Sequence, residues 1–193
     1  QRCSTIGFSN AYLVGPRGGG DALLVDPGEF DAAMLQAIEG NRLRLRWILV
    51  THAHRAHIAG LRGLLRVYEP GIYCNQPSVL EEPARHVQDG DRLSLGEIDV
   101  EVIELPGHSI DSLCFLIGSM LFSGDTLSAG GIGRTRDAYA RGLLVSGIRR
   151  RLLALGDDVL LFPGHGPPSL LGVERRFNPY LRGDPPRDAA AAT

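Results

Sequence analysis

The sequence contains no lysine, and all 20 of its basic residues are arginines. Without lysine, the chain cannot use an ε-amino group as a general base, as a Schiff-base former or as a compact charge that binds phosphate. We interpret the bias as an effect of codon usage, because alanine, glycine, leucine and arginine are all abundant. The absence still removes several kinds of active site from consideration.

Cysteine is scarce, and its three copies stand singly at Cys3, Cys74 and Cys114. An odd count without C-x-x-C spacing argues against a disulfide scaffold and against a zinc site built from thiolates. Cys114 follows Leu113 in an apolar run and is expected to be a small, buried hydrophobic residue. These features favour a reducing compartment, and we expect a cytoplasmic protein.

Long hydrophobic runs and a strong charge imbalance are also missing. No apolar stretch approaches the roughly 20 residues that cross a bilayer, and the net charge of −2 gives no sign of a nucleic-acid-binding surface. We therefore expect neither a membrane nor a nucleic acid as a partner. No signal peptide is apparent, although a chain that starts at Gln1 could have lost a targeting segment. The oligomeric state is left open.

The length of 193 residues and the apolar fraction of 44% predict one soluble domain with a substantial core. We assign residues 1–183 to this domain and expect the Pro- and Ala-rich residues 184–193 to be disordered. The apolar periodicity predicts strands at 5–14, 22–26, 46–50, 72–74, 92–95, 98–105, 113–117, 120–122 and 159–162, and helices at 30–39, 58–65 and 143–155. Two groups of strands with interspersed helices indicate an α/β sandwich of stacked layers.

Five of the six histidines and one aspartate follow strand-like apolar runs. At strand ends, side chains from distant parts of a chain can converge. His52 and His54 are two residues apart, so they face the same way in an extended segment. His57 comes three residues later, where the chain is expected to turn into a helix. The others follow sharp steps in the chain: His108 and His165 each come after Pro-Gly, and Asp125 comes after Ser-Gly.

Histidine and aspartate in this pattern point to a metal site. Neutral imidazoles and carboxylates hold zinc and similar ions, and a catalytic site keeps one position open for water. Asp125 is the only carboxylate in these groups, so it could bridge two ions and is the candidate catalytic residue. Asp26 could orient a metal ligand or simply cap the turn that follows it. His86 has no such neighbours and is expected to face solvent.

The combined pattern resembles the metallo-β-lactamase superfamily, whose first motif is H-x-H-x-D-H followed by separate His, Asp and His ligands. The segments 124–127, 131–135, 163–167 and 172–179 are similar to those of short bacterial hydrolases related to glyoxalase II, which is a hydroxyacylglutathione hydrolase. The resemblance covers residues from about 10 to 181. It implies a four-layer αβ/βα sandwich with the metal at one edge.

The resemblance also implies which residues hold metal. The first ion would be bound by His52, His54 and His108, and the second by His57 and His165. Asp125 would bridge the two ions. We expect zinc, as one or two ions, with iron or manganese as alternatives.

One family ligand is absent, because Ala56 stands where the motif has its aspartate. Two zinc ions around Asp125 and a hydroxide would leave an excess of positive charge, whereas one ion with the same partners would be neutral. Losing even an outer-shell partner weakens metal binding by about 10–100-fold. We therefore expect the second site to fill weakly or not at all, and the activity to be low.

The function that the resemblance implies is metal-dependent hydrolysis, in which water attacks a thioester of the hydroxyacylglutathione type. The partner would be a small thioester, which could be linked to glutathione. Arg134 follows a glycine-rich loop and could bind a substrate carboxylate with two hydrogen bonds, or it could be an ordinary surface residue. Tyr139 is a further substrate-binding candidate. Larger glyoxalase II enzymes use an additional helical domain for glutathione, so we expect their specificity not to carry over.

Two other functions remain open. Relatives of this fold bind one iron through two histidines and an aspartate and oxidise persulfides with O₂, and a single-ion site would suit that chemistry. A chain that binds metal but has lost catalysis could act as a sensor or an interaction module. A β-lactamase is disfavoured by the later segments, and a nuclease by the lack of a basic surface or an extra domain.

Overall fold

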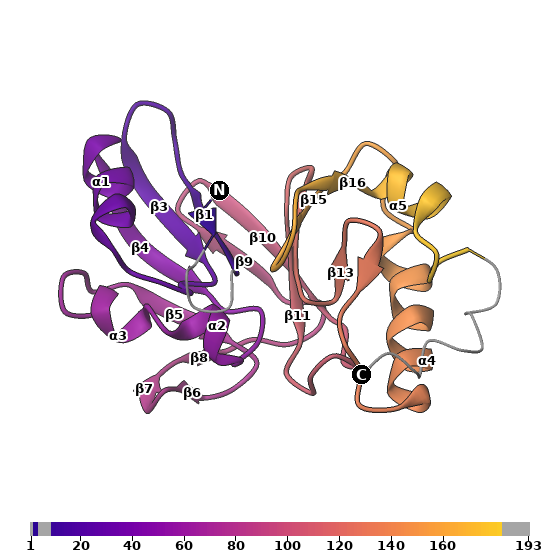
Figure 1. Cartoon of the computed structure of the whole chain (residues 1–193). Helices are drawn as coiled ribbons and strands as arrows, with labels where there is room; N and C mark the ends of the chain where they lie inside the picture. The colour runs from indigo at the N-terminus through magenta and orange to yellow at the C-terminus, as the bar shows by residue number, and fades with distance from the viewer. Residues whose placement is uncertain (1, 4–8, 183–193) are drawn as a thin grey trace.

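Two six-stranded β-sheets form the middle of the computed structural model, which describes residues 2–3 and 9–182 (Figure 1). The first sheet has the order β1-β2-β3-β4-β5-β8, with β1 (Arg2–Cys3), β2 (Asn10–Val14), β3 (Gly20–Val25), β4 (Leu43–Leu49), β5 (Gly71–Cys74) and β8 (Arg85–His86). The second has the order β16-β15-β12-β11-β10-β9, with β9 (Arg92–Leu95), β10 (Ile98–Glu104), β11 (Leu113–Ile117), β12 (Met120–Gly124), β15 (Leu160–Pro163) and β16 (Ser169–Leu170).

Helices and small hairpins complete the described fold. The helices on the first sheet are α1 (Ala32–Gly40), α2 (Arg55–Ile58) and α3 (Leu61–Leu64). Those on the second sheet are α4 (Ala138–Gly147), which continues as a π-helical segment (Ile148–Leu152), and α5 (Leu171–Phe177). The two hairpins are β6 (Ser78–Val79) with β7 (Glu82–Pro83), and β13 (Leu127–Ser128) with β14 (Gly131–Ile132).

Alternation along the strands builds four layers, because successive side chains of a strand point to opposite faces of its sheet. In β11, Phe115 packs between the two sheets, whereas the adjacent Cys114 packs against the helices of the second sheet. In β3, Leu23 faces the inter-sheet core and Leu24 faces the helices of the first sheet. The predicted sandwich of four stacked layers, with helices outside two facing sheets, is present (Figure 1).

Most of the predicted elements are present with small changes at their ends. The predicted hairpins at 92–105 and 113–122 appear as β9–β10 and β11–β12, both antiparallel. His86 is exposed in β8, as expected. Residues 5–8 of the first predicted strand and the predicted tail 184–193 lie outside the described residues.

Two helix predictions needed correction. The helix expected at 143–155 begins at Ala138, because the Asp137 side chain accepts a hydrogen bond from the Ala140 backbone N–H at 2.8 Å and caps the first turn. The helix expected at 58–65 is instead two short turns, α2 and α3. They are separated near Gly60, where a Cβ would lie 2.5 Å from the backbone carbon of Glu29.

The topology places one edge of the sandwich at the ends of several strands. Strands β10 and β12 are both antiparallel to β11, so they run in the same direction. Strand β15 is parallel to β12 and therefore shares that direction. The segment after β4 joins this edge, since the Leu113 backbone N–H donates to the Thr51 carbonyl at 2.8 Å. Among the described residues, no helix is long and apolar enough to cross a membrane.

Candidate metal centre

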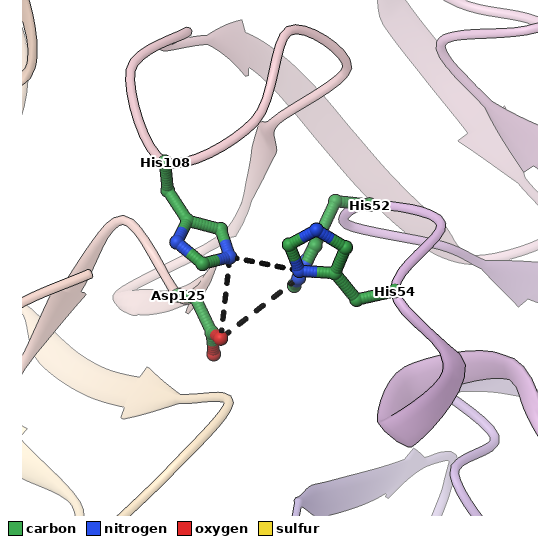
Figure 2. A group of neighbouring side chains, drawn as sticks. All are labelled: His52, His54, His108 and Asp125. Atoms are coloured by element: carbon green, nitrogen blue, oxygen red, sulfur yellow. Dashed lines mark hydrogen bonds and ion pairs between the residues drawn. The ribbon is translucent and has the colours of Figure 1, made fainter. Parts of the chain in front are cut away.

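All six predicted metal ligands converge at this edge of the sandwich. One donor atom from each of His52, His54, His108 and Asp125 lies within 4.8 Å of the others, and Figure 2 shows these side chains pointing toward one another. A second group with the same property consists of His57, Asp125 and His165. Asp125 is shared by both groups, so the structure brings together two adjoining places for an ion.

The Asp26 carboxylate fixes both ends of the segment 51–57, which contains the first three histidines. One oxygen accepts from the Thr51 backbone N–H at 2.8 Å, and the other accepts from the Thr51 hydroxyl at 2.7 Å. The second oxygen also lies 2.9 Å from His57 Nδ1. The His57 ring is thereby turned so that its Nε2 faces Asp125. Of the two roles considered for Asp26, the orienting role is the one that these contacts support.

His108 is held by a backbone carbonyl. Its Nδ1 lies 2.8 Å from the carbonyl oxygen of Arg134. Because a carbonyl can only accept, Nδ1 carries the proton, and in the neutral ring Nε2 is left with a free lone pair. That Nε2 lies 3.0 Å from His54 Nδ1 (Figure 2).

Asp125 stands between the two groups of imidazoles. Its Oδ2 is 3.5 Å from the Nε2 atoms of both His108 and His165, and 3.9 Å from His52 Nε2. Its Oδ1 is 3.4 Å from His57 Nε2. Two donors on one tetrahedral zinc ion at about 2.0–2.1 Å are separated by roughly 3.3 Å. The observed separations therefore match the spacing of donors around a shared ion.

Three buried polar atoms of this cluster lack a hydrogen-bond partner among the described residues: His52 Nε2, His57 Nε2 and Asp125 Oδ1. A buried polar atom without a partner costs about 1–3 kcal/mol. All three face the centre of the cluster, and imidazole nitrogens with carboxylate oxygens form the donor set that zinc and similar ions take. A metal ion fits the residues that are present.

The protonation states also suit a metal in the first group. Burial, reinforced by the charge of His57, lowers the pKa of His52 to about 4, and burial lowers the pKa of His54 as well. Burial raises the pKa of Asp125, but the protonated His57 ring, 3.4 Å away, and the charge of His52 outweigh it and hold that pKa at about 2. At neutral pH His52 and His54 are thus neutral and Asp125 is ionised, as metal binding requires.

His57 behaves in the opposite way. Burial disfavours its charged form, but the Asp26 carboxylate and then Asp125 outweigh burial and raise the pKa of His57 to about 10. The metal-free ring therefore holds a proton at neutral pH. An ion that enters the second group must displace that proton.

Two glycines, Gly164 and Gly133, leave space for the metal-binding side chains because they have no Cβ. A Cβ on Gly164 would lie 2.5 Å from both Asp125 Oδ1 and His57 Cε1, and a Cβ on Gly133 would lie 3.0 Å from His108 Cβ. The sequence reasoning used the Pro-Gly step before His165 as a turn signal. It did not identify this steric requirement.

Three further residues that position the site were missed. Asn10 donates from Nδ2 to the carbonyls of Pro163 and Gly166, at 2.9 and 2.8 Å, on either side of His165. The Tyr12 hydroxyl also donates to the Pro163 carbonyl at 2.6 Å. The Asp111 carboxylate accepts from the Ala53 backbone N–H at 2.8 Å, between the first two histidines. Only the burial of a polar residue could have revealed them, and burial is not visible in a single sequence.

A cleft of about 520 Å³ opens beside the cluster and is lined by His108, Asp125 and His165 together with Arg134. Arg134 is therefore placed where a substrate could reach it. Tyr139 is on α4 and is 76% exposed, but it does not line this cleft.

Ala56 lies in α2, where it supplies no donor to the second group, and its carbonyl accepts a hydrogen bond from the Ser9 hydroxyl. The second group consequently has three donor residues, whereas the first has four.

The stability of the metal-free protein should fall as the pH rises from about 7 to 8.5. The folded-state pKa of His57, about 10, lies above the unfolded value of 6.5. In this pH range the folded state therefore binds more protons than the unfolded state, and the free energy of unfolding falls as the pH increases. Buried Cys74 and Cys114 have raised pKa values and add the same trend only above about 8.5. Urea unfolding at several pH values measures the slope, and a His57→Gln variant with the same slope would contradict this assignment.

Gly164→Ala should weaken zinc binding by about tenfold or more, because the new methyl group would overlap Asp125 and His57. Competition with a chromophoric chelator measures the affinity. Gly142→Ala is the matched control, since a Cβ there meets nothing within 4 Å and the residue lies within α4. Unchanged zinc affinity in Gly164→Ala would show that the site lies elsewhere.

Comparisons with known proteins agree with this geometry. Residues 4–165 match the family model of the metallo-beta-lactamase superfamily. An uncharacterized protein of Mycobacterium leprae is 34% identical, covering 90% of this chain and 94% of the relative. The hydroxyacylglutathione hydrolase GloC of Haemophilus influenzae is 32% identical, covering 83% of this chain and 87% of the relative.

Solved structures give the same result. The crystal structure of BLEG-1 B3 metallo-beta-lactamase superposes with a TM-score of 0.82 at 27% identity, covering 94% of this chain and 97% of that one. TTHA1623, solved in a di-iron-bound form, superposes with a TM-score of 0.78 at 30% identity, covering 92% and 97%. The family match, the similar folds and the cluster of histidines around Asp125 show that this chain belongs to the metallo-β-lactamase superfamily.

Proposed function

We propose that this protein is a metal-dependent thioester hydrolase that works mainly with one ion. The observation that carries the proposal is the group of four donors, His52, His54, His108 and Asp125, beside a cleft that contains Arg134. The similarity to a hydroxyacylglutathione hydrolase over most of both chains supports a thioester as the substrate.

The two groups divide the ligands unequally. The first ion would be held by His52, His54 and His108, which leaves the fourth position of a tetrahedral zinc open for water beside Asp125. The second would have only His57 and His165 besides the shared Asp125, because Ala56 offers no carboxylate. It would also compete with the proton that Asp26 holds on His57. Zinc suits these donors, and iron or manganese would fit them too.

These residues would hold a zinc ion, which would supply a bound water with a pKa near 7 and hence a nucleophile at neutral pH. The residues of the chain orient the reaction. Ionised Asp125 can accept a hydrogen bond from the attacking water and direct it toward the cleft. The Arg134 guanidinium can bind a substrate carboxylate through two parallel hydrogen bonds. The leaving group is a thiol with a pKa near 8.5 in water, so it can depart as a thiolate without a strong general acid.

We expect the zinc-loaded protein to hydrolyse a hydroxyacyl thioester, with S-lactoylglutathione as the first substrate to assay. Elemental analysis of the purified protein should give close to one tightly bound ion per chain. An Arg134→Ala variant should raise KM more than it lowers kcat, because the guanidinium binds the substrate at a distance from the reacting carbonyl. Nitrocefin serves as a comparison substrate for β-lactamase activity. One bound zinc ion with no turnover of any thioester would instead indicate a metal-binding protein without catalysis.

Restoring the family carboxylate should strengthen the second site. Ala56→Asp should bind a second zinc ion about 10–100-fold more tightly than the parent, and its hydrolysis rate should rise. Titration of the metal-free protein with zinc, counting bound ions, gives both affinities. Ala56→Asn is the matched control, because it has nearly the same shape without the charge. Two tight zinc ions in the parent would overturn the argument from Ala56, and so would a variant that binds two ions yet remains equally slow.

A single-ion redox enzyme is the second candidate. The complete first group beside an incomplete second group favours a mononuclear centre, and two of its three histidines with Asp125 would supply the two-histidine, one-carboxylate set that suits iron(II) reacting with O₂. Iron in the purified protein together with O₂ consumption in the presence of glutathione persulfide would select this function over hydrolysis.

A further inference from the structure

Two buried polar side chains, Glu174 in the first turn of α5 and Asn178 at its C-cap, bind the hairpin formed by β13 and β14. Glu174 is 2% exposed and Asn178 is fully buried. The Glu174 carboxylate accepts from the Gly130 backbone N–H at 2.9 Å, at the tip of the hairpin. Asn178 Nδ2 donates to the Gly131 carbonyl at 3.0 Å and lies 3.5 Å from the Ser128 carbonyl.

The two side chains also bind each other and the neighbouring strand. Asn178 Nδ2 donates to Glu174 at 2.8 Å, and the Ser169 hydroxyl donates to the other carboxylate oxygen at 2.6 Å. Both carboxyl oxygens therefore have hydrogen-bond partners, which compensates for the burial of this polar group. We call Glu174 and Asn178 the α5 clamp. The clamp belongs to the segment 172–179, which none of the chemistry described above has used.

The clamped hairpin connects two parts of the metal centre. Asp125 lies two residues before β13, and Gly133 and Arg134 directly follow β14. The Arg134 carbonyl accepts from His108 Nδ1 at 2.8 Å. Gly133 packs so tightly that a Cβ on it would lie 1.9 Å from the Asp125 carbonyl oxygen and 3.0 Å from His108 Cβ. A shift of the hairpin would therefore be transmitted to one ligand along the chain and to the other through its hydrogen bond.

Outside the clamp, Leu127 in the core and the Ser123 hydroxyl, which donates to the Leu127 carbonyl at 2.7 Å, hold the base of the hairpin. Its ladder joins only Leu127 to Ile132 and Ser128 to Gly131, and a two-stranded hairpin of this size is not stable alone. Its tip at Gly130 has a positive φ of 70°, and the clamp contacts it there. The side chains of α5 thus supply hydrogen bonds that a wider sheet would otherwise provide.

We propose that Glu174 and Asn178 are positioning residues for the metal centre, which act through the hairpin to hold Asp125 and His108 in a metal-binding geometry. This inference rests on the proposed function, because it takes the first group as the occupied site. It predicts that a change remote from the donors alters how tightly and with what geometry the ion is bound.

The test is to measure zinc affinity by chelator competition and cobalt(II) geometry by visible absorption in full-length variants. Glu174→Ala and Asn178→Ala should weaken zinc by about 10–100-fold, as loss of an outer-shell partner does, and should change the cobalt spectrum. Glu174→Gln should stay within about threefold of the parent, because its amide oxygen can accept from Gly130 and Asn178 while its NH₂ donates to the Ser169 hydroxyl.

Leu171→Ala is the matched control. Leu171 is fully buried in the same helix and packs in the core, so its truncation lowers the melting temperature without removing a hydrogen bond to the hairpin. If Glu174→Ala and Asn178→Ala bind zinc as tightly as Leu171→Ala, the residues are merely structural and the proposal is overturned.

Ser169→Ala covers the case in which the alanine variants do not fold. It removes one hydrogen bond to Glu174 from a half-buried position and should weaken zinc by a smaller factor than the loss of the whole clamp. Parent-like zinc affinity and an unchanged cobalt spectrum in Ser169→Ala would count against the clamp. If the parent itself binds no zinc, the proposed function fails first, and this result is distinct from a parent that binds zinc with variants that bind it equally well.

Discussion

The convergence of several imidazole nitrogens on one carboxylate is the constraint on which this site depends. Asp125 directly follows β12, and four ring nitrogens from three separate segments of the chain lie 3.4–3.9 Å from its carboxylate. Bringing this many donors together is unfavourable unless an ion or a proton occupies the space between them. His52 and His54 avoid mutual repulsion by remaining neutral, since burial lowers the pKa of His52 to about 4 and lowers that of His54 as well. Their neutrality leaves them ready to bind a cation.

The two halves of the centre differ because of one missing side chain. The first group retains a full set of donors. In the second, Ala56 removes a negative charge, while Asp26 supplies one at a different place, 2.9 Å from the far side of the His57 ring. A negative charge in that position stabilises a proton on the ring as well as an ion in front of it. A proton and a metal ion consequently compete for the second group. For this reason, occupancy of the second group by a metal ion should depend on pH more strongly than occupancy of the first group.

Much of the fold and of the donor set could be predicted from sequence, for definite physical reasons. The alternation in strands such as β10 and β11 reports which face is buried, and the H-x-H spacing in an extended segment places two rings on one side. Long-range polar contacts could not be predicted. The bonds from Asn10 to the carbonyls around His165 and from Asp111 to Ala53 join residues that are distant in the chain. The early start of α4 was missed because a single cap at Asp137 outweighed the apolar periodicity that begins later.

The origin of the donors along the chain has a mechanical consequence. His52, His54 and His57 come from the part of the chain that builds the first sheet, whereas His108, Asp125 and His165 come from the part that builds the second. An ion bound among them would link the two sheets, which otherwise pack against each other mainly through apolar side chains. Ligand binding to the folded state alone adds stability that grows with free metal concentration. The supply of metal would then govern the resistance of the chain to opening and proteolysis as well as its chemistry.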